Sequence, residues 1–192
     1  GERCIQVLIS DKQKTVDNRD PVTNLFNRQY FMQLLEKALA KAMETQTRSV
    51  LFFIALDNFK SIEPAGIDLV HKNIAQVISK LCDGTWARFG EGTFALLMTD
   101  KDGKKFADAP ELAGKICKAV EATVTDLNEQ QAFVTTCSIG ITQVLGSDAN
   151  SQVALNDAHT ACKKALKEGG NRSEVYKVES GGGLGNVAKL IE

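Results

Sequence analysis

The sequence predicts an α+β fold, a palm of the split βαβ type with a central, mainly antiparallel sheet flanked by helices. The first observation is the stretch 84–98, where two apolar runs flank the turn Gly90-Glu91-Gly92-Thr93, as in a β-hairpin. The second is the order of the segments, whose hydrophobic periods indicate helix, strand, helix, hairpin, helix, strand, helix, strand. Strands and helices that share an antiparallel hairpin are typical of this class.

Composition fits one globular domain with short extensions, since the 192 residues are 43% hydrophobic and 24% charged. The net charge of −1 gives no broad electrostatic reason to expect nucleic acid or an anionic membrane as partner. No apolar run approaches the roughly 18–20 residues that span a bilayer. The cysteines form no C-x-x-C pair, so we expect buried, reduced thiols in a cytoplasmic protein. They are Cys4, Cys82, Cys117, Cys137 and Cys162.

A lone strand is predicted at residues 3–9, which are rich in apolar and β-branched side chains, followed by a polar connector over 10–20. Nothing beside this strand in the sequence supplies a hairpin partner. We therefore assign residues 1–17 to the tail of an upstream domain that resembles a PAS sensor, together with its connector. The alternative is an extra strand that pairs with this domain or with a neighbour.

The first half of the domain begins with turn residues at 20–28, where Asp20 and Pro21 bend the chain and Asn27 is a candidate helix cap. A helix over about 27–46 follows, and the continuous apolar run 49–57 predicts a central strand. The next helix begins after the turn 63–66. Its expected buried side chains are Leu69, Val70, Ile74, Val77, Ile78 and Leu81.

The second half begins with a polar stretch, 99–108, which predicts a surface loop. We expect a helix from about Pro110 to Leu127, a strand over 133–141, a helix over 151–168 and a last strand over 175–178. The inner face of the first of these helices is expected to hold Leu112, Ile116, Cys117, Val120 and Val124. For the histidines, His71 and His159, we expect surface or helix-packing roles because neither has a partner at metal-ligand spacing.

The hairpin resembles the signature motif of GGDEF domains, the cyclases that join two GTP molecules into cyclic di-GMP. Arg88, Phe89, Gly90 and Phe94 fit that motif, whereas Glu91, Gly92 and Thr93 depart from it. The stretch 20–28 resembles the opening motif of the same family, and the run around Ser138-Ile139-Gly140 resembles its late strand. The resemblance covers residues 18–178 and implies a nucleotidyl-cyclase-like palm with a degenerate signature motif.

The resemblance also indicates which catalytic groups are replaced. Aligning Phe59-Lys60 on the family's Phe-Lys pair puts Ala55 and Gly92 at the two metal-ligand positions and Thr93 at the candidate base. Magnesium binding needs carboxylates, and a neutral hydroxyl is no general base at neutral pH. We therefore expect no catalytic residue, no metal and no cofactor. Asp57 alone is a poor magnesium site.

Nucleotide-recognition positions are replaced as well. Glu63 replaces a guanine-reading asparagine, and the second guanine reader falls at His71 or Lys72. Leu166 and Gly170 take the place of a phosphate-binding Lys and Arg, so that Lys60 alone stays in register. We also expect no product-feedback site, because its Arg and Asp positions are Leu81 and Gly84.

These replacements favour an inactive domain that regulates or scaffolds cyclic di-GMP signalling. The pattern is similar to bacterial FimX-type PAS-GGDEF-EAL proteins, which control type IV pilus motility and biofilm behaviour. The glycine-rich residues 179–192 are then a linker and the start of an EAL-like domain. Neighbouring PAS-like and EAL-like domains are the expected partners, and a homodimer is possible. One alternative is an allosteric nucleotide site at Asn58, Phe59 and Lys60; an active cyclase is the other.

Overall fold

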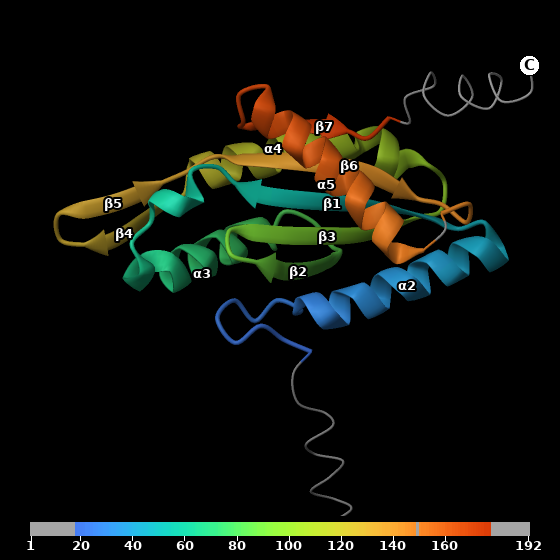
Figure 1. The fold of residues 1–192 in the computed structure, drawn as a ribbon, viewed down its shortest axis with the longest axis horizontal. Helices are drawn as coiled ribbons and strands as arrows, with labels where there is room; N and C mark the ends of the chain where they lie inside the picture. The colour runs from blue at the N-terminus through green and yellow to red at the C-terminus, as the bar shows by residue number, and fades with distance from the viewer. Residues whose placement is uncertain (1–17, 149, 178–192) are drawn as a thin grey trace, which may run out of the picture.

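The structure is a computed structural model that describes residues 18–148 and 150–177. The predicted strand at 3–9 and the linker at 179–192 lie outside these residues. Figure 1 shows a central sheet with helices on both of its faces and a two-stranded hairpin that projects from one end. No helix within the described ranges is both long enough and apolar enough to cross a bilayer.

The central sheet has five strands in the order β2-β3-β1-β6-β7. Its central strand, β1, is antiparallel to both of its neighbours, β3 and β6, while β7 is parallel to β6. The mainly antiparallel sheet that the sequence predicts is therefore present. The bounds are Arg48–Leu56 for β1, Thr85–Gly90 for β2, Thr93–Asp100 for β3, Cys137–Val144 for β6 and Arg172–Val175 for β7.

Four α-helices cover the sheet in two pairs. Val50, Phe52 and Ile54 of β1 pack in one apolar cluster with α3 and α4, and Leu51 and Phe53 pack in a second cluster with α2 and α5. Successive strand side chains point to opposite faces, so both faces of β1 are buried and its sequence is continuously apolar. The helices are α2 (Arg28–Thr45), α3 (Ile67–Ile78), α4 (Lys104–Glu121) and α5 (Ser151–Lys167).

Helix α4 corrects two expectations about the second half. It begins at Lys104, so the predicted surface loop over 99–108 is wrong, and Pro110 lies inside the helix rather than at its start. The buried carboxylate of Asp100 explains the early start, because it accepts hydrogen bonds from the amides of Lys105 (3.2 Å) and Phe106 (3.0 Å). Such a carboxylate satisfies the first free N–H groups of a helix.

The predicted continuation of α4 to Leu127 is also wrong. The helix ends at Glu121, and residues Val124–Asn128 form strand β4, which pairs with β5 (Gln131–Val134) in a separate hairpin. Val124, expected on the inner face of a helix, is 55% exposed. The predicted strand over 133–141 is consequently two strands, β5 and β6.

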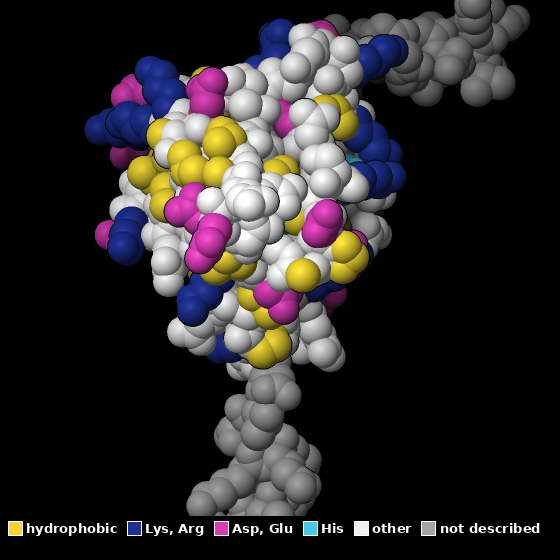
Figure 2. Space-filling view, turned by 90° about the vertical axis from the view of Figure 1, so that its left-hand side faces the viewer, with side chains coloured by type: hydrophobic (Ala, Val, Ile, Leu, Met, Phe, Trp, Pro, Cys, Tyr) yellow, Lys and Arg dark blue, Asp and Glu magenta, His cyan; other side chains and the backbone are white. Residues whose placement is uncertain are grey.

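Smaller corrections concern individual bounds and side chains. The last strand, β7, ends at Val175, three residues before its predicted end. Leu69 and Leu81, expected to be buried, are 40% and 36% exposed. Figure 2 views the molecule from the end that carries the β4–β5 hairpin and shows hydrophobic side chains scattered on that surface among charged ones.

The stretch 18–28 joins the N-terminal end of the domain to strand β2. The amide of Phe26 donates to the carbonyl of Trp86 (3.1 Å), and the amide of Arg88 donates to the carbonyl of Phe26 (3.0 Å). The guanidinium of Arg88 also forms an ion pair with Asp20 at 3.2 Å. Burial raises the pKa of the Asp20 carboxyl, but hydrogen bonds from Thr23 and the charge of Arg88 outweigh it and bring the pKa below its usual value. These contacts hold the signature hairpin from its outer edge.

Candidate functional site at the signature turn

A groove of about 440 Å³ lies where the C-terminal end of β1, the β2–β3 turn and the last turn of α5 meet. This is where the sequence places the signature motif and the altered metal positions. The groove is lined by Ala55, Leu56, Asp57, Asn58, Phe59, Lys60, Glu91, Gly92, Thr93 and Leu166.

The turn itself is fixed by its second glycine. Gly92 has φ +67°, a left-handed conformation that favours glycine, and a Cβ there would lie 2.6 Å from Cγ of Phe59. Its carbonyl accepts a hydrogen bond from the amide of Leu56 at 2.8 Å, which ties the turn to the end of β1. Glu91 is exposed beside it. The positive φ and the close approach of the backbone are those that the sequence predicts for a glycine in this hairpin.

His71 of α3 supports the turn from beneath. The amide of Gly92 donates to Nε2 of His71 at 2.8 Å, and the imidazole is fully buried. Because Nε2 is the acceptor, we assign the proton of the neutral ring to Nδ1. Burial is the main cause that lowers the pKa of His71, and the positive charge of Arg88 lowers it further. The ring of Phe59 lies 4.9 Å from the imidazole and completes the support. The expected helix-packing role is therefore correct, whereas a surface role is excluded.

The carboxylate of Asp57 is turned into the protein. It accepts hydrogen bonds from Oγ1 of Thr136 (2.6 Å), Oγ of Ser138 (2.7 Å) and the amide of Asn171 (3.0 Å), and the residue is only 7% exposed. A Cβ at Gly170 would lie 2.8 Å from Oδ2 of Asp57, so this turn also approaches the carboxylate closely. The side chain thus joins the end of β1 to β6 and to the turn between α5 and β7.

Uncharged side chains occupy the two facing positions at the mouth of the groove. Ala55 of β1 and Thr93 of β3 are direct partners in the antiparallel register. Leu166 of α5, at the position of a family lysine, is 52% exposed at the rim. Within the described residues, no group of three or more His, Cys, Asp or Glu side chains is placed to hold a metal ion. The donor set of this groove does not fit magnesium, which prefers carboxylate and phosphate oxygens.

The segment after β1 keeps a feature suited to anions. Asn58 has φ 55°, and Phe59–Ser61 form a short 3-10 helix after it. Within the described part of the chain, no hydrogen bond occupies the amides of Asn58, Phe59 and Lys60. A left-handed residue followed by right-handed ones lets successive N–H groups converge on an anion. These are the residues to which the alternative hypothesis, an allosteric nucleotide site, assigns a remaining nucleotide contact.

Other positions singled out from the sequence lie apart from this groove or are engaged elsewhere. Lys72 and Glu63 are exposed on α3 and the turn before it. At the end of α5, Arg172 forms ion pairs with Glu174 (2.7 Å) and Glu168 (3.1 Å). Lys164 is 3.6 Å from Glu174. Arg172 and Lys164 therefore belong to a surface ion-pair network, and neither lines the groove.

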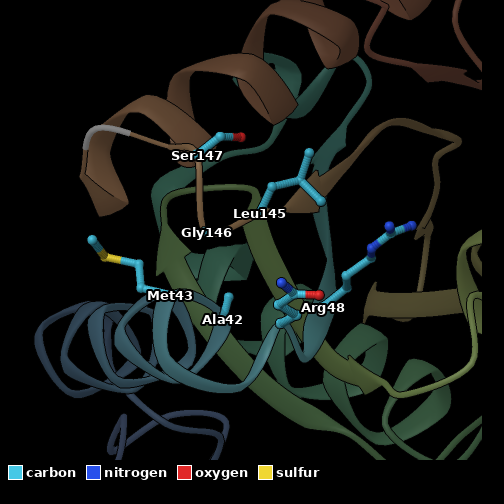
Figure 3. A pocket seen from close by; sticks show the side chains of 7 residues that line it. Ala42, Met43, Arg48, Leu145, Gly146 and Ser147 are labelled. Carbon is cyan, nitrogen blue, oxygen red and sulfur yellow. The ribbon is translucent and has the colours of Figure 1, made fainter.

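A second hollow, of about 510 Å³, lies at the far end of α2 (Figure 3). There the loop after β6 crosses the helix so closely that a Cβ at Gly146 would lie 2.9 Å from the carbonyl oxygen of Ala42. Among the described residues that line this hollow, Arg48 is the only charged one, and none belongs to the signature turn.

The arrangement of a five-stranded palm, a signature hairpin and a groove at the end of β1 defines a nucleotidyl-cyclase-like class of fold. A family model described as "Diguanylate cyclase, GGDEF domain" matches residues 17–172. The chain belongs to that family.

The similar proteins are consistent with this assignment. The probable diguanylate cyclase DgcT of Escherichia coli is 32% identical over 174 residues, which are 86% of this chain and 37% of the relative. The crystal structure of the FimX GGDEF domain from Pseudomonas aeruginosa has a TM-score of 0.74 and 29% identity, and covers 84% of this chain and 100% of that one. A GGDEF-only structure of TpbB (YfiN) from the same organism has a TM-score of 0.72 and 27% identity, over 91% of this chain and 99% of that one. The chain spans about a third or less of its curated relatives, for example 22% of the bifunctional enzyme MucR of Pseudomonas aeruginosa.

Proposed function

We propose that this GGDEF domain does not join nucleotides and instead serves as a regulatory or scaffolding module in a cyclic di-GMP signalling protein. The observation that carries the proposal is the pair Ala55 and Thr93 at the mouth of the groove, together with an Asp57 carboxylate already occupied by three donors. Of the two carboxylates that line the groove, Asp57 is held by these donors and Glu91 is exposed on the hairpin turn rather than at the end of β1.

The chemistry of the family's reaction explains why this matters. Joining two GTP molecules needs a divalent ion to polarise the phosphates and to stabilise the developing charge. It also needs a base within reach of the attacking hydroxyl. Alanine supplies neither group, threonine is a weak neutral ligand, and the glycine at position 92 has no side chain. The one carboxylate of the turn, Glu91, is exposed and adds negative charge where phosphates would lie.

We propose that the module relays a signal between a PAS-like domain before it and an EAL-like domain after it, in the cytoplasm, by domain packing or dimerisation. The similarity to the FimX GGDEF domain supports this arrangement. The N-terminal stretch 18–28 is connected to β2 through the hydrogen bonds of Phe26 and the Asp20–Arg88 ion pair, which offers a path from an upstream domain to the signature hairpin. In this proposal, that hairpin transmits a conformational state instead of holding substrate.

The proposal is tested by incubating the chain with GTP and either Mg²⁺ or Mn²⁺ and separating the nucleotides by chromatography. An active GGDEF domain assayed in parallel is the positive control. We expect no cyclic di-GMP above the level of a protein-free blank. Steady turnover would overturn the proposal.

A second candidate is an allosteric nucleotide site without cyclase activity. The free amides after Asn58 and the adjacent Lys60 favour it, because main-chain N–H groups can bind phosphate without a metal ligand. Calorimetric titration of GTP with Mg²⁺ tests it. Saturable binding that Lys60→Ala abolishes and Lys37→Ala preserves would establish this site, since Lys37 is an exposed lysine on α2 outside the groove. No heat at tens of micromolar protein would leave the scaffold proposal standing.

A further inference from the structure

Two buried thiols face each other across the interface between α4 and the sheet. Cys117 lies near the end of α4 and Cys137 is the first residue of β6. Their sulfur atoms are 3.8 Å apart, and Sγ of Cys117 also lies 3.6 Å from the carbonyl oxygen of Cys137. The two sulfurs are in van der Waals contact, and a disulfide requires them to approach to about 2.05 Å.

The chain between these thiols is the β4–β5 hairpin. Helix α4 ends at Glu121, the hairpin runs over residues 124–134, and β6 begins at Cys137. The hairpin projects from the end of the molecule in Figure 1. Beyond the packing of Leu127 against Gly66, it is joined to α3 by a hydrogen bond of 3.2 Å from Asn73 to Thr125. Cys117 and Cys137 therefore stand on the two sides of the hairpin's base.

We propose that Cys117 and Cys137 are a redox-reactive dithiol, a modification site that hydrogen peroxide converts into a disulfide that closes the base of the β4–β5 hairpin. Hydrogen peroxide is an oxidant of about the size of water, which suits a thiol with little exposure. The reaction does not depend on nucleotide binding at the groove.

The two thiols have distinct roles in this reaction. Cys117 is 6% exposed and Cys137 is fully buried, so the peroxide meets Cys117 first. The hydrogen bond from Cys137 lowers the pKa of the Cys117 thiol, and the same hydrogen bond together with burial raises the pKa of Cys137. Once Cys117 is oxidised, the second thiol beside it can resolve it as a disulfide.

The steps balance as follows. The Cys117 thiolate attacks one peroxide oxygen, the O–O bond breaks, and Cys117 becomes a sulfenic acid as hydroxide leaves and takes up a proton to form water. The thiol of Cys137 then gives up its proton and attacks the Cys117 sulfur, which releases the sulfenic oxygen as a second water. In sum, two thiols lose two protons and two electrons, and one hydrogen peroxide is reduced to two waters.

The remaining described cysteines lack this arrangement and serve as internal controls. Cys82 is half-buried, and burial followed by the charge of Asp83 raises the pKa of its thiol. Cys162 is buried, its thiol lies 3.3 Å from the carbonyl oxygen of Ser138, and burial raises its pKa to about 12. Neither thiol contacts a second sulfur among the described residues. We therefore expect Cys82 to be oxidised singly and Cys162 to react last.

The test is peroxide treatment of the native chain followed by acid quenching, alkylation and chymotryptic peptide mapping by mass spectrometry. Chymotrypsin cleaves after Phe133 and Leu145, which separates Cys137 from Cys162. We expect the Cys117 and Cys137 peptides to be linked, with a mass two units below the sum of the two free peptides, and the link to be reversed by dithiothreitol. The linked peptide should persist in Cys162→Ala and vanish in Cys117→Ala.

Thermal unfolding and amide hydrogen exchange measure how the disulfide changes the stability of the fold. The bond closes a loop of about 20 residues, and such disulfides commonly raise Tm by several degrees, here about 5 °C or more. Amide exchange in β4 and β5 should slow in the oxidised form. The proposal fails if Cys82 is oxidised while the Cys117 and Cys137 peptides stay reduced. It also fails if Cys117 goes to the sulfinic acid without a link. Both outcomes are read on the native chain, so they do not depend on the variants folding.

Discussion

Replacing Asp57 separates a structural carboxylate from a catalytic one. In the structure, Asp57 is an acceptor for Thr136, Ser138 and the amide of Asn171, all at 3.0 Å or less. Asp57→Ala would leave these donors without their partner, and Ser138 is fully buried, so water cannot replace the carboxylate there without rearrangement. We therefore expect a large loss of stability and no loss of metal binding.

The magnitude follows from the three donors. A hydrogen bond to a charged group contributes about 1.5–3 kcal/mol, and neighbouring bonds do not add fully. We expect Asp57→Ala to lower the free energy of unfolding by about 3–5 kcal/mol, which corresponds to a fall in Tm of about 6–20 °C for a domain of this size. Asp57→Asn should lower the stability less than Asp57→Ala, because its side-chain oxygen still accepts a hydrogen bond. It should still be destabilising, because its NH₂ group cannot accept from the remaining donors.

Urea unfolding in the presence of a chelator measures this effect without any metal. Asp126→Ala is the matched control, because Asp126 is an exposed carboxylate on β4, and we expect it to change stability by less than about 0.5 kcal/mol. If Asp57→Ala were as mild as this control, the carboxylate would not be holding the strand ends together. The argument that it is unavailable to a metal would then be refuted.

Two further predictions concern the signature turn. Gly92→Ala should destabilise the domain by about 1–2 kcal/mol more than Gly103→Ala, because both glycines have positive φ but only Gly92 would contact Phe59, and Gly103 has open space. Equal losses in urea unfolding would show that the contact is unimportant. For His71, the folded pKa lies below its usual value of 6.5, so the unfolded chain binds the proton first and stability falls as pH drops from 7 toward the folded pKa. The contribution of His71 to this fall in stability is at most about 1.4 kcal/mol per pH unit. In His71→Gln the remaining slope should be the part due to His159, whose pKa is also lowered by burial. An unchanged pH slope in that variant would contradict the assignment.

The sequence predicts the sheet well because its strands carry strong local patterns. Within the run 49–57, residues 50–56 are all apolar, and the hairpin at 84–98 has its glycine where the backbone needs one. The β4–β5 hairpin was missed because its connection, Glu129-Gln130, has no glycine, proline or asparagine-glycine pair. Residues 120–127 also continue the apolar period of α4, so no local signal ends the helix there.

In the candidate site, features that depend on neighbouring residues can be predicted from the sequence, whereas contacts between distant residues cannot. The glycine of the turn follows from its own neighbours, as the sequence analysis indicates, whereas the left-handed conformation of Asn58 is not predicted there. The partners of Asp57 are 79, 81 and 114 residues away, and Gly92 is 21 residues from His71. Nothing in the local pattern shows that these carboxylate and imidazole groups are turned inward. Pro110 is a similar case. Only the side chain of Asp100, which accepts a hydrogen bond from the amide of Phe106, shows that the helix begins before this proline.

The most direct test of the central claim is the yield of cyclic di-GMP from GTP at high protein concentration, where any pairing of two domains is favoured. The assay is run with Mg²⁺ and with Mn²⁺, on the native chain and on Lys60→Ala. The account predicts no product in any of the four samples over hours. Product from the native chain that Lys60→Ala lowers would contradict it, because it would show that this groove supports the reaction without carboxylates at positions 55 and 92.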